Sequence, residues 1–191
     1  TIGPQAFRLG TAFMRRSGIV ERARPILRTL MEHTGETANL GILQGDAVLF
    51  LSQVETTETI RAFFPPGTRS ALHASGIGKA LLAFGRPETL RTLLARGPLA
   101  RFTDTTLTDP QALEADLARI RHRGFSFDDE ERTRGMRCIA APVFDLSGEA
   151  IAGLSVSGPT NRIALEHVKT LGAVVAAAAA SLSDAMGGPT P

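Results

Sequence analysis

The chain has 191 residues, of which 43% are hydrophobic and 21% are charged, and this balance is typical of a globular protein. A net charge of only +2, a single cysteine and the absence of Trp and Tyr argue against a nucleic-acid platform and exclude an internal disulfide framework. No signal-peptide pattern is visible, and the longest apolar stretch, Leu171 to Ser181, is about half of a membrane crossing, so we expect a cytoplasmic protein without membrane contact.

Positive charge is concentrated in the first thirty residues. They contain six arginines and one glutamate, whereas the rest of the chain contains 15 basic and 18 acidic residues. Apolar residues recur at helical spacing from Pro4 to about Arg16 and from Ile19 to about His33, which predicts two helices. Pro25 predicts a kink in the second helix, and Gly35 is a typical residue to end it. The basic segment is either a solvated helix face or a surface able to approach phosphates.

Three short strands are expected after the second helix. The ranges Thr37–Leu43 and Ala47–Val54 have strand composition and are joined by Gln44-Gly45-Asp46, which indicates a hairpin. The second strand begins with five apolar residues in a row, so we expect other layers to cover it on both faces and to place it centrally. A third strand is predicted over Thr59–Phe63, where Pro65-Pro66-Gly67 would end it.

The rest of the chain predicts helices first and then a second hairpin. The central helices are expected over Gly76–Phe84, Pro87–Ala95 and Pro110–His122, the last capped by Asp109. The remaining elements are strands over Phe125–Asp128, Cys138–Asp145 and Ala150–Ser157 and a closing helix from about Arg162 to Met186. This mixed order, with a hairpin near each end, predicts an α+β fold in which a mainly antiparallel sheet of about six strands carries helices on both faces.

The segment Ala74-Ser75-Gly76-Ile77-Gly78-Lys79-Ala80 has the outline of a phosphate-binding loop but lacks two of its residues. His73 stands where the loop needs glycine, and Ala80 stands where it needs serine or threonine. What remains is a glycine-bearing helix start, which either only packs or offers backbone N–H groups to an anion. The four histidines have no metal-ligand spacing, so we expect neither a metal nor a cofactor.

Several polar side chains stand in otherwise apolar strands. Ser155 and Ser157 alternate with apolar residues and therefore share one face of their strand. Asp128 ends a short apolar strand and can turn inward, although the acidic run that it begins is also typical of a solvated loop with ion pairs. No nucleophile–base pair is evident, so we expect a binding pocket and no catalytic residues. The alternative is a small hydrolase or isomerase that uses Cys138 with His73 or Asp128.

Three longer motifs stand out by their order and spacing. They are Leu72-His73-Ala74-Ser75-Gly76-Ile77-Gly78-Lys79-Ala80-Leu81-Leu82-Ala83; Gly124-Phe125 leading to Asp128-Asp129-Glu130-Glu131 and Gly135-Met136-Arg137-Cys138-Ile139-Ala140-Ala141-Pro142-Val143; and Ser155-Val156-Ser157-Gly158-Pro159. Together they resemble the C-terminal effector-binding domain of the IclR family of bacterial transcriptional regulators. The resemblance implies a GAF-like, profilin-like domain over residues 19–188. Residues 1–18 would be a linker helix from a missing N-terminal winged helix-turn-helix domain, through which alone a homodimer or tetramer would bind DNA.

The resemblance also implies a small-molecule effector, expected to be an organic or aromatic carboxylic acid. The backbone N–H groups of Gly76 and Ile77 would bind its carboxylate. Further contacts would come from the polar residues Asp128, Cys138, Ser155 and Ser157 and from the wall residues Met136 and Ala62. The family usually has larger apolar residues where Ala62 and Ser70 stand, which implies a roomier or more polar pocket.

Overall fold

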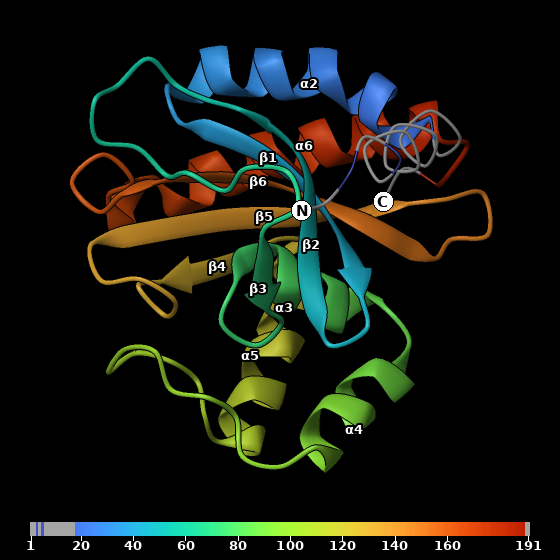
Figure 1. The fold of residues 1–191 in the computed structure, drawn as a ribbon, viewed down its shortest axis with the longest axis vertical. Coiled ribbons are helices and arrows are strands. Elements are labelled where there is room, and N and C mark those ends of the chain that lie inside the picture. The colour runs from blue at the N-terminus through green and yellow to red at the C-terminus, as the bar shows by residue number, and fades with distance from the viewer. Residues whose placement is uncertain (1–2, 4, 6–17, 190–191) are drawn as a thin grey trace.

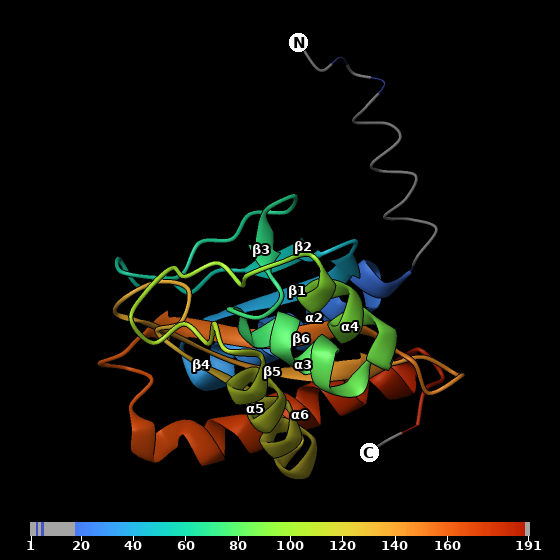
Figure 2. The ribbon, with the colours of Figure 1, turned by 90° about the horizontal axis from the view of Figure 1, so that it is seen from below.

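The computed structural model describes residues 3, 5 and 18–189 (Figure 1). The helix predicted before Arg16 and nearly all of the linker predicted over residues 1–18 lie outside the described residues. Residues 18–189 contain a six-stranded sheet with the order β3-β2-β1-β6-β5-β4, in which all neighbours are antiparallel. Helices lie on both faces of this sheet (Figures 1 and 2), which confirms the predicted α+β fold.

Both predicted hairpins and all three central helices form close to their expected bounds. The strands are β1 (Thr37–Gln44), β2 (Ala47–Val54), β3 (Arg69–Ala71), β4 (Ser126–Asp129), β5 (Met136–Phe144) and β6 (Ala150–Pro159). The helices are α2 (Ile19–Thr34), α3 (Gly76–Phe84), α4 (Pro87–Ala95), α5 (Pro110–Arg123) and α6 (Val168–Ala185), with a 3-10 turn over Leu165–His167. Strand β1 pairs with β6 and so joins the two hairpins into one sheet.

Local signals explain where several helices begin and end. Asp109 caps α5, because its carboxylate accepts a hydrogen bond from the N–H of Ala112 at 2.8 Å. Gly35 ends α2 in the left-handed region, with a φ of 71°, and its N–H donates to the carbonyl of Met31 at 2.8 Å. One face of α5, formed by Leu113, Leu117 and Ile120, is fully buried.

The two faces of the sheet carry separate hydrophobic cores. Helices α2 and α6 pack on one face, around Leu154 and Val156 of β6. Helices α3 and α5 pack on the other face, where Ile77 is buried. Strand β2 supplies Leu51 to the first core and Val48 to the second, so it is covered on both faces as predicted. The prediction that this strand lies centrally is wrong, because it is second from the sheet edge, beside the short β3.

The prediction of a third strand over Thr59–Phe63 is wrong. This segment forms no strand, and Ile60 and Phe63 are largely exposed, at 70% and 61%. The pairing comes after the prolines, because the N–H of Gly67 donates to the carbonyl of Phe50 at 2.8 Å and starts a return along β2. The turn at Pro65-Pro66-Gly67 therefore precedes the edge strand β3 and does not end one.

The closing helix begins at Val168, later than the predicted Arg162. Two long-range contacts hold the preceding residues out of the helix. Ile163 is fully buried in the core. The guanidinium of Arg162 binds both carboxylate oxygens of the buried Glu36, with N–O distances of 2.5 and 2.9 Å. Neither contact can be predicted from sequence periodicity, because each involves a residue far away in the chain. The helix begins C-terminal to both Arg162 and Ile163.

The segment Leu165–Ala185 is long and apolar enough, by length and composition, to cross a membrane. It is longer than the apolar run Leu171 to Ser181 because it also includes flanking residues, among them the charged Glu166, Lys169 and Asp184. In the folded chain Val175, Ala179 and Leu182 of this helix are buried in the core beneath the sheet. The core helix of a globular domain accounts for the same length and composition.

Helix α6 approaches the sheet so closely that one of its positions requires glycine. A Cβ at Gly172 would lie 2.3 Å from the ring of Phe125, which is itself buried. We expect Gly172→Ala to lower the free energy of unfolding by about 1–3 kcal/mol, although alanine is the better helix former. Urea unfolding measures this, and Phe125→Leu in the same chain should recover part of the loss. A Gly172→Ala variant as stable as the parent would contradict the close approach.

Candidate functional site

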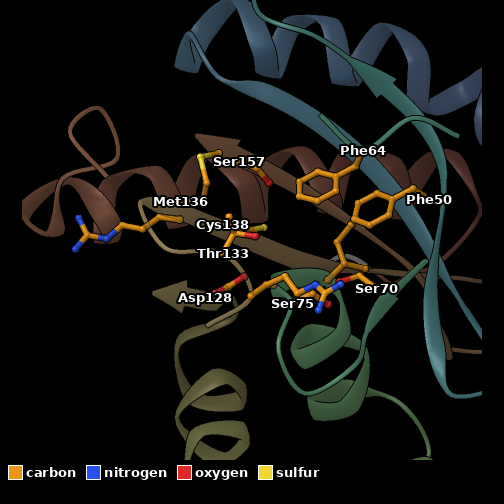
Figure 3. Close-up of a pocket in the computed structure, with 13 residues that line it drawn as sticks. Phe50, Phe64, Ser70, Ser75, Asp128, Thr133, Met136, Cys138 and Ser157 are labelled. Carbon is orange, nitrogen blue, oxygen red and sulfur yellow. The ribbon is translucent and has the colours of Figure 1, made fainter. Parts of the chain in front are cut away.

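A pocket opens where α3 begins, above strands β5 and β6 and beside the loop that follows β4 (Figure 3). It contains about 440 Å³ of space outside protein atoms, of which the centre of a water molecule can reach about 30 Å³. Its accessible wall is mostly apolar. The lining residues are Phe50, Phe64, Ser70, Ser75, Gly76, Ile77, Asp128, Arg132, Thr133, Met136, Arg137, Cys138 and Ser157.

Most of the predicted contact residues meet at this pocket, namely Gly76, Ile77, Asp128, Met136, Cys138 and Ser157. Ser155 and Ala62 do not line it. Ser155 is fully buried further along β6, where the Nδ2 of Asn39 donates to its hydroxyl at 3.4 Å. Ala62 is buried in the loop after β2, and its carbonyl accepts a hydrogen bond from Gln53 at 3.3 Å. Whether any of these residues contacts an effector stays a prediction.

Helix α3 starts at the pocket with its first N–H groups directed out of the helix. Ser75 is the N-cap, and its hydroxyl accepts from the N–H of Gly78 at 3.2 Å. The helical ladder begins with the N–H of Lys79, which donates to the carbonyl of Ser75 at 2.9 Å. The N–H groups of Gly76 and Ile77 therefore have no acceptor within the helix and carry its partial positive charge. Both residues line the pocket, so an anion could be bound there.

Asp128 brings an acidic group into the same pocket. Its side chain comes from β4, the residue is 6% exposed, and its Oδ1 accepts the N–H of Glu131 at 2.8 Å. Burial, together with the negative charge of Glu131, raises the pKa of Asp128 to about 7. The inward orientation predicted as one option for this residue is thus the one observed. The carboxyl group is poised to exchange a proton near neutral pH.

The raised pKa of Asp128 makes stability depend on pH. The folded protein holds a proton here that the unfolded chain releases near its ordinary pKa, so this group destabilises the fold as pH rises from about 4 to about 7. We expect Asp128→Asn to be more stable than the parent at pH 8, with a gap that is about 2–3 kcal/mol smaller at pH 5. Urea unfolding at the two pH values measures it. Asp104→Asn, at a highly exposed carboxylate, should show no such gap.

The hydrolase or isomerase alternative does not fit this geometry. Burial, together with the charge of Asp128, raises the pKa of the Cys138 thiol to about 11, so the thiolate is scarce at neutral pH. His73 does not line the pocket, and its Nε2 is engaged with the carbonyl of Ala100 at 2.8 Å. Burial lowers the pKa of His73. His73 is therefore not placed to act as a base toward Cys138. Residues 18–189 also contain no cluster of three or more His, Cys, Asp or Glu residues that could bind a metal ion.

Two contributions to the pocket were not expected from the sequence. Phe50 and Phe64 stack with ring centroids 4.9 Å apart and form an apolar wall. Arg132, which belongs to a run typical of a solvated loop, also lines the pocket, and its guanidinium lies 3.9 Å above the ring of Phe102. Within residues 18–189 no carboxylate forms an ion pair with Arg132, so its charge is available to a ligand. Ser70, one of the two positions for which the resemblance implied a roomier or more polar pocket, does line it and adds a hydroxyl.

A buried ion cluster lies beneath the loop that carries Arg132. The Nζ of Lys79 on α3 donates to Asp116 on α5 at 2.8 Å, to Glu131 at 2.5 Å and to the carbonyl of Phe127 at 2.6 Å. Burial alone would lower the pKa of Lys79, but the charges of Glu131 and Asp116 outweigh it and hold that pKa above its ordinary value. Lys79, the lysine of the incomplete phosphate-loop motif, is thus a structural cation that fixes one wall of the pocket.

The chain is similar to known regulators over nearly its whole length. Residues 11–184 match the family model described as bacterial transcriptional regulator IclR C-terminal. The HTH-type transcriptional regulator BhcR of Paracoccus denitrificans is 69% identical over 185 residues, which cover 97% of this chain and 66% of that protein. The transcriptional repressor IclR of Escherichia coli is 43% identical over 98% of this chain and 69% of that protein. The chain therefore spans about two thirds of the length of these curated relatives.

A solved structure agrees with the fold. The crystal structure of the Thermotoga maritima IclR matches with a TM-score of 0.89 and 30% identity, over 97% of this chain and 75% of that chain. These relatives are regulators, which removes the remaining support for the hydrolase or isomerase alternative.

Proposed function

Because the chain belongs to the IclR family of bacterial transcriptional regulators and forms their effector-binding domain, we propose that the pocket at the start of α3 binds a small carboxylic acid. The observation that supports this most is the helix start itself. The N–H groups of Gly76 and Ile77 have no acceptor within α3 and lie at the positive end of the helix in a largely apolar pocket. A carboxylate bound there would accept hydrogen bonds from these N–H groups and would also be stabilised by the positive end of the helix dipole.

The charge and the hydroxyl groups around this helix start favour the same ligand. Arg132 contributes a positive charge with no carboxylate partner within residues 18–189. Ser157 and the Cys138 thiol lie opposite one another across β5 and β6 and supply neutral hydrogen-bonding groups. The Phe50–Phe64 stack and Met136 would contact the carbon skeleton. The set suits an acid with one carboxylate and a short chain.

The size of the pocket narrows the choice among acids. About 30 Å³ is open to the centre of a water molecule, where about 10–15 Å³ suffices for one water. Aliphatic acids of a few carbons therefore fit with little rearrangement. Hydroxybenzoates are larger and would require Phe64 or Met136 to move. We propose a small aliphatic acid ahead of an aromatic one.

The proposal extends to the whole protein. Ligand binding at this pocket would control DNA binding by a helix-turn-helix domain of the full-length regulator, as a cytoplasmic homodimer or tetramer. The names of the relatives, which include an HTH-type regulator and a repressor, support this role. Two-fold symmetric assembly would place two such domains on two half-sites.

A thermal-shift screen tests the ligand class. The panel is glyoxylate, pyruvate, sugar acids, hydroxybenzoates and aliphatic diacids, each compared with its uncharged amide or alcohol analogue where one exists. A ligand at a hundred times its Kd stabilises the fold by about 2.7 kcal/mol, which corresponds to a Tm increase of about 5–10 °C for a domain of this size. If the uncharged analogues raised the Tm as much as the acids do, the carboxylate proposal would be contradicted.

Removing two hydroxyls tests the place of binding. We expect Ser155→Ala with Ser157→Ala to raise the Kd of a panel hit by about tenfold or more, because Ser157 lines the pocket and Ser155 adjoins it through Asn39. Isothermal titration calorimetry measures the change. Ser181→Ala removes an exposed hydroxyl on α6 and serves as the matched control. An unchanged Kd in the double variant would place the ligand elsewhere.

A further inference from the structure

A carboxyl group of the protein and the proposed carboxylate of the ligand share one small space. Asp128 lines the same pocket as Gly76 and Ile77, and the residue is 6% exposed. Only about 30 Å³ of that pocket is open to the centre of a water molecule, so little solvent can separate the two groups. The inference below concerns the protonation state of Asp128. It rests on the proposed function, because the second carboxylate is that of the proposed ligand.

No cation among residues 18–189 is paired directly with the carboxyl group of Asp128. Within residues 18–189 no Lys, Arg or His nitrogen forms an ion pair with it, and its Oδ1 accepts the N–H of Glu131 at 2.8 Å. The buried cation of this region, Lys79, is already shared between Glu131 and Asp116. Asp116 also pairs with Arg119, at 3.0 Å. The positive charge below the pocket is thus compensated before Asp128 ionises.

The ionisable groups around Asp128 come from every element packed against it. They are Lys79 on α3, Asp116 on α5, Glu131 and Arg132 on the loop after β4, Asp129 beside it on β4, and Arg137 and Cys138 on β5. Arg137 is bound to Asp129 at 2.7 Å, and the Cys138 thiol stays protonated at neutral pH because its pKa is about 11. The charge that acts most directly on Asp128 is the negative one of Glu131.

We infer that Asp128 binds the ligand as a neutral carboxylic acid, donating its O–H to a carboxylate oxygen of the ligand, so that binding takes up one proton. Two carboxylates in contact cannot both be ionised at neutral pH, and one proton is then shared between them. The ligand carboxylate faces the N–H groups of α3, whereas Asp128 has Glu131 as its charged neighbour. The proton therefore resides on Asp128.

Proton uptake makes affinity fall with rising pH. A site whose free carboxyl group titrates near pH 7, the value for Asp128, loses affinity about tenfold per pH unit above that point if the complex keeps the proton. Between pH 6.0 and pH 8.5 the Kd should rise about 30-fold. Ligands with a neutral amide in place of the carboxylate lack the charge that holds this proton and should show no such dependence.

The test is calorimetric titration of the wild-type chain with acetate and with pyruvate, whose carboxyl groups stay ionised over this range. Titrations at pH 6.0, 7.0 and 8.5 give the Kd, and borate and Tris buffers at pH 8.5, which differ in heat of ionisation, give the number of protons bound. We expect close to one proton at pH 8.5. In Asp128→Asn the amide N–H₂ donates in place of the acid, so uptake should vanish and the Kd should become independent of pH. Asp104→Asn, at an exposed carboxylate, should behave like the wild type.

The possible results distinguish the role of Asp128 from the proposed binding of a carboxylate. Binding by the wild type with no proton uptake overturns the role of Asp128 and leaves the carboxylate site standing. Uptake that persists in Asp128→Asn and disappears in Glu131→Gln assigns the proton to Glu131 and also overturns the inference. Failure of both acids to bind at any of the three pH values overturns the carboxylate proposal, and the inference falls with it.

Discussion

Replacing Lys79 with methionine should lower the free energy of unfolding by about 3–5 kcal/mol, the range for breaking a buried ion pair from one side. The Lys79 side chain is 1% exposed and its ammonium donates to two carboxylates and a carbonyl. Methionine fills nearly the same space, so the loss comes from the two carboxylates: Glu131 is left without a cation, and Asp116 keeps only the exposed Arg119. Thermal unfolding at pH 7 should show a Tm lower by on the order of 10 °C.

Two further variants isolate the electrostatic cause. Lys169→Met changes the other lysine of the chain, which is exposed on α6, and should leave the Tm nearly unchanged. Lys79→Met combined with Asp116→Asn and Glu131→Gln removes all three charges and should regain much of the lost stability. If Lys79→Met unfolds at the same temperature as Lys169→Met, the cluster does not carry this energy.

Adding one methyl group at Gly76 should weaken both the fold and ligand binding. The Cβ of alanine at this position would lie 2.7 Å from the Sγ of Cys138 and 3.3 Å from the Cβ of Ala140. Relieving that overlap costs about 1–3 kcal/mol of stability. The methyl group would also displace the ligand from the N–H groups of α3, so we expect the Kd of a panel hit to rise tenfold or more. Urea unfolding and calorimetric titration measure the two effects separately.

A second substitution distinguishes crowding from loss of the helix start. Cys138→Ala removes the Sγ that the new methyl group would strike, so Gly76→Ala with Cys138→Ala should recover most of the stability. The affinity should recover less, because the methyl group still stands beside the N–H of residue 76 at the start of α3. Equal losses in the single and the double variant would show that the thiol is not what limits residue 76.

Features that depend on neighbours in sequence were predictable, and features that depend on distant partners were not. Asp109 and Gly35 mark helix ends because each bonds to a residue a few positions away. The strand predicted over Thr59–Phe63 failed because pairing along β2 is set by the turn at Gly67, and local composition does not encode which segment returns. Ile163 and the Arg162–Glu36 pair delayed the last helix for the same reason.

The candidate site divides in the same way. Alternation along a strand and the glycines of a helix start pointed to Ser157, Gly76 and Asp128, which do line one pocket. Alternation could not show that Ser155 lies past the pocket, since both serines share one face. Local sequence presents Lys79 only as part of an incomplete motif and Arg132 only as part of a charged loop. The role of each depends on residues that are distant in sequence and close in the fold. Glu131, for example, lies 52 positions from Lys79.

The pairing of β1 with β6 has a consequence for how the protein reaches its working state. Each hairpin is local in sequence, but Thr37 pairs with Ser157 and Asn39 with Ser155, so the seam between the hairpins closes a very long loop. Because the entropy of closing this loop opposes such non-local pairing, we expect the seam to form late and folding to be slow. Ser157 lies on that seam and lines the pocket, so the pocket is incomplete until the seam has closed. A ligand should accordingly slow unfolding while leaving the folding rate almost unchanged.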